Sequence, residues 1–204
     1  MRTDPLVSGT PGRPLSAELS EQLVAVAVDI LAEEGWGRLN SDRVAARARA
    51  GKAGIYRRWP SMSALARSAV SRFTLVTAPQ DEGSPRADLA ALVASWRRPL
   101  SREERAVASL VGAARHDEDL RAGLDAALVH PLTDAVETLG DRWSARGEEV
   151  PAERLALLRS VLEAFWWQRL TVAGDGALVA EHVEQVVDDV LLPIVAPAVE
   201  PVAS

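Results

Sequence analysis

Basic side chains are concentrated in one short stretch of the sequence. Between Trp36 and Arg72 there are nine basic residues and a single acid, Asp42, which gives this segment a formal charge of +8. Because the whole chain carries -6, the remainder carries -14. A compact cationic segment on an acidic chain indicates contact with a polyanion through that segment alone. The alternative is a solvated helical face, which is what most charge clusters are.

The same segment contains the only lysine and the only tyrosine of the chain, Lys52 and Tyr56. Their four-residue spacing places them on one face of a helix, together with Ala53. An ammonium group can hold a phosphate there, and a phenol beside it can reach into a DNA groove. Arg57 and Arg58 follow directly and can bind phosphate, the alternative being a contact with guanine. The alternative for Tyr56 is a half-buried core aromatic.

The sequence lacks the residue patterns of common catalytic and metal sites. It has no cysteine, which excludes disulfides, zinc ribbons, iron–sulfur clusters and thiol catalysis. His116, His130 and His182 have no HExxH or similar spacing, and no glycine-rich phosphate loop or GxSxG is present. The acidic run after His116 is typical of a helix N-terminus. We therefore expect no catalytic residue, metal or cofactor, and a metal-dependent helical enzyme is the weakest alternative.

The elements that must position the basic residues are short helices. Proline and glycine in residues 1–15 predict a flexible N-terminal arm. Apolar spacing predicts a helix over residues 16–35, and Asn40 is a good N-cap for a short helix over 41–48. A further helix over 52–58 precedes Pro60, and Ser61 can cap another from Met62 to about Val76. Two short helices after a long one are the pattern of a helix-turn-helix.

The stretch from Val44 to Leu65, VAARARAGKAGIYRRWPSMSAL, resembles the DNA-binding domain of the TetR family of bacterial repressors. Val44–Ala48 match that family's second helix, and Lys52–Ser61 match its recognition helix and the following turn, apart from Gly54. The resemblance implies a DNA-binding domain that acts as a dimer on a palindromic operator. The residues that we expect to contact DNA are Ser41, Arg43, Arg49, Lys52, Ala53, Gly54, Tyr56, Arg57 and Arg58.

Four positions depart from the family's usual sequence. Arg49 stands where glycine is usual, so either this residue is strained or the turn is built differently. Gly51 replaces a serine cap, Gly54 replaces a threonine on the DNA side, and Met62 replaces a lysine. These changes leave open a second interpretation, in which a degenerate helix-turn-helix belongs to a helical ligand-binding or protein-interaction module.

The rest of the chain is helical throughout. Apolar spacing and breaks at proline and glycine predict helices near residues 86–98, 102–115, 118–145, 152–173 and 177–195, the third kinked at His130 and Pro131. We expect an all-α fold, with an N-terminal three-helix helix-turn-helix domain followed by a larger helical ligand-binding and dimerisation domain. The predicted division is a flexible arm at 1–15, a DNA-binding domain at 16–60, a connecting helix at 61–78 and a C-terminal domain at 79–204.

The last two predicted helices carry broad apolar stripes. In the family that the chain resembles, such helices form a four-helix dimer interface, and an isologous two-fold interface would bury both stripes at once. The predicted interface residues are Leu158, Phe165, Val183, Val187 and Val190. The alternative is the core of a monomeric bundle.

Four of the six tryptophans lie in the C-terminal part of the chain. Effector pockets are mostly apolar, so we expect an apolar small-molecule effector in a pocket lined by Trp96, Leu110, Trp143 and Trp166. The alternative is that these side chains only fill the core.

These observations predict a DNA-binding transcriptional regulator, a homodimeric repressor that releases its operator when an effector binds. The longest uncharged apolar stretch, Val190–Val199, contains two prolines and is too short to cross a bilayer. We therefore expect a cytoplasmic, nucleoid-associated bacterial protein.

Overall fold

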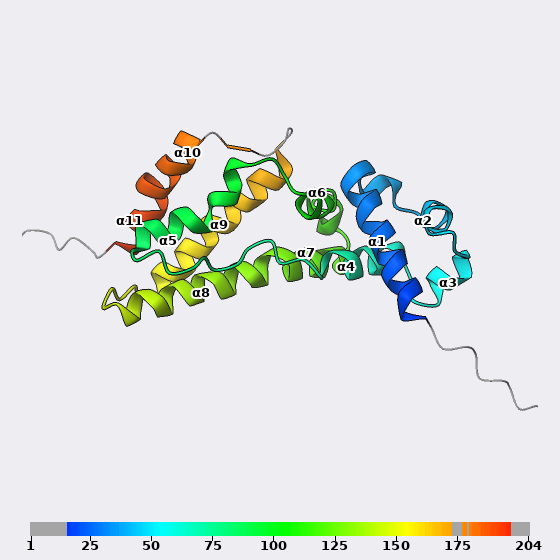
Figure 1. Cartoon of the computed structure of the whole chain (residues 1–204), viewed down its shortest axis with the longest axis horizontal. Helices are drawn as coiled ribbons and strands as arrows, with labels where there is room; N and C mark the ends of the chain where they lie inside the picture. The colour runs from blue at the N-terminus through cyan, green and yellow to red at the C-terminus, as the bar shows by residue number, and fades with distance from the viewer. Residues whose placement is uncertain (1–15, 173–176, 179, 197–204) are drawn as a thin grey trace, which may run out of the picture.

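The computed structural model describes residues 16–172, 177–178 and 180–196 of the chain. The predicted N-terminal arm, residues 1–15, lies outside this part. The described residues form helices and connecting segments, with no strand among them, which confirms the all-α prediction. The molecule is elongated, with the helix-turn-helix at one end and the connection between the two longest C-terminal helices at the other (Figure 1). No helix of the described part is long and apolar enough to span a membrane.

The helix-turn-helix consists of α1 (Ala17–Glu34), α2 (Ser41–Ala48) and α3 (Lys52–Tyr56), with a 3-10 turn η1 (Trp36–Arg38) after the first helix. Side-chain caps determine where these helices start. The hydroxyl of Ser16 accepts from the N–H of Leu19, and the side-chain oxygen of Asn40 accepts from the N–H of Arg43 at 2.9 Å. The predicted bounds of the first two helices are therefore confirmed.

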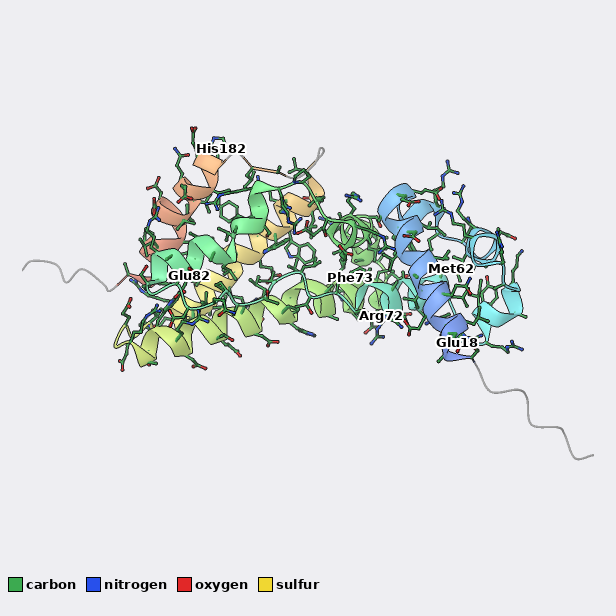
Figure 2. The ribbon with its side chains drawn as sticks, viewed as in Figure 1. Glu18, Met62, Arg72, Phe73, Glu82 and His182 are labelled. Atoms are coloured by element: carbon green, nitrogen blue, oxygen red, sulfur yellow. The ribbon has the colours of Figure 1, made fainter. Side chains whose placement is uncertain are left out.

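The connecting helix α4 (Met62–Val70) starts at its predicted cap, Ser61, but it ends before the predicted Val76. Beyond Val70 the chain becomes extended and runs along α8 (His130–Ala145) (Figure 1). The reason is a hydrogen bond outside the helix: the N–H of Leu75 donates to the carbonyl of Ala127 at 3.0 Å. Arg72 and Phe73 mark the point where the chain leaves α4, between the two halves of the molecule (Figure 2).

The C-terminal domain follows the predicted order of helices, but four of the five predicted segments contain a 3-10 or π-helical turn. The first two segments end in 3-10 turns. Their elements are α5 (Pro85–Leu92), η2 (Ala94–Arg97), α6 (Arg102–Ala108) and η3 (Ala113–Arg115). The third is α7 (Glu118–Leu124), a π-helical turn η4 (Asp125–Val129) and α8. The fourth is the continuous α9 (Ala152–Thr171), and the last comprises α10 (Ala180–Gln185), a π-helical turn η5 (Val186–Leu191) and α11 (Leu192–Val195).

Proline accounts for both π-helical turns. Pro131 follows η4 and Pro193 follows η5, each at the second residue of the next helical segment. Because proline has no N–H, it cannot donate to the carbonyl four residues before it, and the helix widens at that point. For Pro131 that carbonyl belongs to Ala127, which accepts from Leu75 instead. The predicted irregularity near His130 is thus also the point where the connecting segment is attached.

The two halves of the molecule are packed against each other through α1 on α6 and α4 on α7. The second contact is close: a Cβ added to Gly123 would lie 2.8 Å from a methyl carbon of Val70, so only glycine fits without a shift. Polar contacts accompany this packing. Ser63 on α4 donates to Asp117, the N-cap of α7, and Arg67 on α4 forms an ion pair with Asp119 at 3.2 Å. The helices α4 and α7 are therefore joined by both apolar and polar contacts.

Candidate DNA-binding face and effector domain

The outer side of α3 presents a small set of exposed side chains. Lys52, Ala53, Tyr56 and Arg57 are all exposed, and the Tyr56 side chain keeps 52% of its surface accessible. Lys52 forms an ion pair with Asp42 on α2, and this hydrogen bond raises the pKa of its ammonium group above the ordinary value. The ammonium is therefore fully charged at physiological pH and is held at the start of the helix.

Two residues predicted on this face lie elsewhere. Gly54 is buried, on the side of α3 that faces α1. Arg58 turns inward: its guanidinium donates to the carbonyl of Gly54 and to the hydroxyl of Ser20, both at 2.8 Å. It also reaches the carbonyl of Ser16 at 3.2 Å. Both predictions are corrected, because Gly54 faces α1 and Arg58 joins α3 to the start of α1 with a hydrogen bond from each of its three nitrogens.

The remaining arginines of this unit fall into two groups. Arg43 is paired with Glu34 at 2.6 Å and Arg47 with Glu33 and Glu34, so the second helix is attached to the end of the first. The guanidinium groups with no hydrogen bond or ion pair to another described residue are those of Arg38, Arg49 and Arg57. Sequence reasoning did not single out Arg38, because it lies outside the matched motif, although it belongs to the basic cluster. Ser41 is half-buried at the first position of α2.

The turn between α2 and α3 has the conformation that glycine usually supplies. Arg49 has φ 50° and ψ 41°, the left-handed region, and it is the single non-glycine residue with positive φ in the described part of the chain. The N–H of the next residue, Ala50, donates to the carbonyl of Ala45 at 3.0 Å, which closes the helix end. Of the two predicted possibilities, the strained residue is the one observed.

Replacing Arg49 by glycine is expected to raise the free energy of unfolding by about 1 kcal/mol, because glycine adopts this conformation without a Cβ clash. Chemical denaturation of the wild-type protein and the variant measures this difference. Arg49→Ala is the matched control: it removes the same charge, keeps the strain and should give no gain. Equal stability of the glycine and alanine variants would contradict the strain assigned to Arg49.

Residues after α3 anchor it to the rest of the domain. The indole N–H of Trp59 donates to the hydroxyl of Ser68 on α4 at 2.8 Å, and its ring packs on the core. Met62 lies at the start of α4 (Figure 2), is half-buried and also packs on the core. It therefore stabilises the turn through apolar contact, where the usual lysine would reach a phosphate.

Comparisons with known proteins agree with this arrangement. Residues 23–69 match the family described as "Bacterial regulatory proteins, tetR family", and residues 79–190 match "Tetracyclin repressor-like, C-terminal domain". The DNA-binding transcriptional repressor TetR of Mycobacteroides abscessus is 32% identical over 183 residues, which are 87% of this chain and 94% of that protein. The chain belongs to the TetR family.

Two solved structures have the same fold. The TetR family transcription regulator SCO0332 is 26% identical with a TM-score of 0.59, and the match covers 88% of this chain and 100% of that one. The transcriptional regulator SCO7518 from Streptomyces coelicolor A3(2) is 17% identical with a TM-score of 0.64, covering 88% and 99%. The resemblance found in residues 44–65 is thereby confirmed, and this TetR-family protein is a DNA-binding transcriptional regulator.

The four residues predicted to line the effector pocket are core residues of this TetR-family fold. Trp96, Leu110, Trp143 and Trp166 keep at most 2% of their surface exposed. The ring of Trp96 lies edge-on to that of Trp166, with centroids 6.3 Å apart. All four side chains pack inside the domain, which agrees with the alternative that they fill the core, and the pocket stays a prediction at these positions.

Trp143 has a structural partner of its own. Its indole N–H donates to the buried carboxylate of Asp88 at 2.8 Å, and Arg142 and Arg146 complete the group at 3.2 and 2.9 Å. Burial raises the pKa of Asp88, but hydrogen bonds from the Glu82 N–H, Arg146 and Trp143 outweigh it and leave the pKa below the ordinary value. Asp88 is therefore an ionised carboxylate that joins α5, α8 and the segment before α5.

Cavities in the described part of the protein lie at other places in the fold. One of about 630 Å³ lies at the far end, between the start of α5, the α8–α9 connection and α11. A polar one of about 360 Å³ lies between Phe73 and the start of α6. The third, of about 490 Å³, is an open groove between η3, α7 and the end of α9. None of the predicted pocket residues lines them.

The residues predicted for the dimer interface differ in how exposed they are. Leu158, Val183 and Val187 are fully buried within the single chain, so they belong to its own core and add no surface to an interface. Phe165 is partly buried, and Val190 keeps 37% of its surface exposed. The prediction is therefore corrected at the three buried residues, which lie on the inner sides of α9 and the last helical segment.

Proposed function

We propose that this TetR-family regulator is a repressor that binds a palindromic operator as a homodimer and releases it when a small molecule binds its C-terminal domain. The observation that carries the proposal is the exposed face of α3. It combines Lys52 and Tyr56 with Arg57, and two further unpaired cations, Arg38 and Arg49, lie in the same domain. Such a set supplies both phosphate anchors and a groove-facing side chain.

In this proposal, each part of the fold has a separate role. Residues 16–60 serve as the DNA-binding domain, 61–78 as the connection and 79–204 as the effector and dimerisation domain. The intact turn at Arg49 argues against a degenerate helix-turn-helix, since the residue takes the conformation that the motif requires. We infer no catalytic role for the chain. Because its proposed partner is DNA, we place the protein in the cytoplasm, at the bacterial nucleoid.

A homodimer is supported by the distribution of exposed apolar side chains. The large hydrophobic residues that are exposed in the described part are Tyr56, Leu157, Val172 and Val190. Apart from the tyrosine of α3, all lie in or next to the last two helical segments. Along α9, every exposed residue from Ala156 onward is uncharged, which is atypical of a helix that faces water. Leu157 is the large exposed hydrophobic residue of this face and replaces Val187 as the residue that tests the proposed interface.

The DNA contacts are tested by Lys52→Ala and Tyr56→Ala. Each variant is expected to bind operator DNA roughly 5- to 100-fold more weakly, because each loses one groove or phosphate contact per half-site. Gel shift over a range of salt concentrations measures the affinity, and the lysine variant should also give a shallower salt dependence. Arg86→Ala, at the opposite end of the molecule, is the control and should bind as the wild type does. Unchanged affinity in both α3 variants, with folding intact, would reject this face as the DNA contact.

A further inference from the structure

The groove at the end of α9 combines an apolar floor with two cationic side chains. Val111, Ala114 and Leu124 form part of its apolar lining, together with the half-buried ring of Trp167. Arg115 and Arg121, from η3 and α7, also line it and are exposed. Its volume of about 490 Å³ lies within the range of small-molecule sites.

These two arginines differ from the others of the C-terminal domain. Every other arginine between residues 79 and 196 donates a hydrogen bond or forms an ion pair within the described chain. The guanidinium groups of Arg115 and Arg121 have no such partner among the described residues. In an acidic domain where the other guanidinium groups are satisfied internally, two that are left free in one groove create a local site for an anion.

We propose that this groove binds a small amphipathic organic anion, with a carboxylate or sulfonate held by Arg115 and Arg121 and an aromatic or aliphatic body on Trp167. Guanidinium groups match the planar geometry of an acid group and bind it with charge-assisted hydrogen bonds. The apolar floor removes the body of the ligand from water. This inference rests on the proposed function in one respect, because it identifies the anion as the effector that releases the operator.

The position of α7 explains how occupancy of the groove reaches the DNA-binding domain. Arg121 and Leu124 of α7 line the groove, whereas Gly123 between them packs directly on Val70 of α4. The N-cap of the same helix, Asp117, accepts a hydrogen bond from Ser63 of α4. A ligand that separates α7 from α9 therefore presses α7 against α4, and the tight glycine contact leaves no room to absorb the shift.

The test uses the full-length protein and anilinonaphthalene sulfonate, an aromatic anion whose fluorescence rises when it leaves water. The uncharged phenylnaphthylamine has the same aromatic body and serves as the neutral probe. We expect saturable binding of the anion, weakened at least about tenfold in the double variant Arg115→Gln and Arg121→Gln, since two charge-assisted hydrogen bonds are lost. Arg86 lines the cavity of about 630 Å³ but is paired with Asp188, so Arg86→Gln should leave binding unchanged. The neutral probe should bind both proteins equally.

The outcomes separate this inference from the proposed function, because the binding assay contains no DNA. Equal anion affinity in the wild type and the double variant, with circular dichroism unchanged, would overturn the anion site. A change in the monomer–dimer equilibrium of the double variant, with anion binding intact, would assign the groove to contact with a second copy of the chain and also overturn it. If the anion binds through both arginines yet leaves operator affinity unchanged in gel shift, the groove is not an effector site. Failure of the wild-type protein to bind DNA at all would count against the proposed function alone.

Discussion

Replacing Asp88 by alanine is expected to lower the free energy of unfolding by about 3 to 5 kcal/mol. The carboxylate has no exposed surface, and it accepts hydrogen bonds from Arg142, Arg146, Trp143 and the backbone N–H of Glu82. Its removal leaves the indole N–H of Trp143 and the N–H of Glu82 without their acceptor, and it takes from Arg142 and Arg146 their one buried counter-ion. Removing one side of a buried ion pair costs this much because the partner charges lose the group that compensated their desolvation.

Denaturant unfolding of the full-length protein measures the effect, and Asp81→Ala is the matched control. Asp81 pairs with the same Arg146 but is exposed, so its loss should cost no more than about 1 kcal/mol. A cost for Asp88→Ala as small as that of the control would show that the buried group does not hold the domain together.

The same carboxylate has a defined pH dependence. Because its pKa in the folded protein is lowered from the ordinary value of 3.8, its contribution to stability is fully present above that value. The contribution is lost as the pH falls through the lower folded pKa. The stability gap between the wild type and Asp88→Asn should therefore be constant at neutral pH and shrink only in strong acid. A difference in stability that narrows between about pH 8 and about pH 5 would contradict an ionised carboxylate.

Placing a charge on the exposed α9 face, by Leu157→Glu, should produce monomers that no longer bind the operator tightly. In the proposed dimer, each copy would place an unpaired carboxylate in the apolar interface, which costs several kcal/mol and weakens association by about 100-fold or more. Operator affinity should fall with it, because a single half-site lacks the effective concentration that the second subunit supplies. Sedimentation velocity and gel shift on the same preparation measure both effects.

Thr138→Glu is the control for this variant, since it adds the same charge on the exposed side of α8. It should remain a dimer with the wild-type affinity for DNA. A Leu157→Glu protein that sediments like the wild type would move the interface away from α9, and a wild-type monomer at micromolar concentration would remove the dimer altogether.

Local signals made the helix-turn-helix predictable from sequence. Asn40 and Ser61 are side-chain caps, and each starts a helix where the pattern places it. The strain at Arg49 was one of two predicted possibilities, because the position of a usual glycine says which backbone conformation the turn requires. The direction of the Arg58 side chain was not predictable, since it depends on Ser16 and Ser20, which are distant in the sequence and adjacent only in the fold.

In the C-terminal domain, the spacing of apolar residues along the helices predicts only part of the structure. An apolar stripe identifies the buried side of a helix, but it does not say whether that side faces the same chain or a second one. Val183 and Val187 were assigned to the dimer for this reason, and the structure buries both against their own domain. The groove at Arg115 and Arg121 has no local signal, because two arginines become notable only when the partners of all the others are known.

The claim that this protein reads DNA as a dimer is tested most directly by selecting binding sites from a random duplex library with the purified full-length chain. The predicted result is an enriched palindrome with two inverted half-sites whose centres lie about 34 to 36 Å apart, one turn of the double helix or a multiple of it. Tyr56→Ala should enrich the same sequence poorly or not at all. Recovery of an unpaired half-site, or of no sequence above the starting library, would contradict the account.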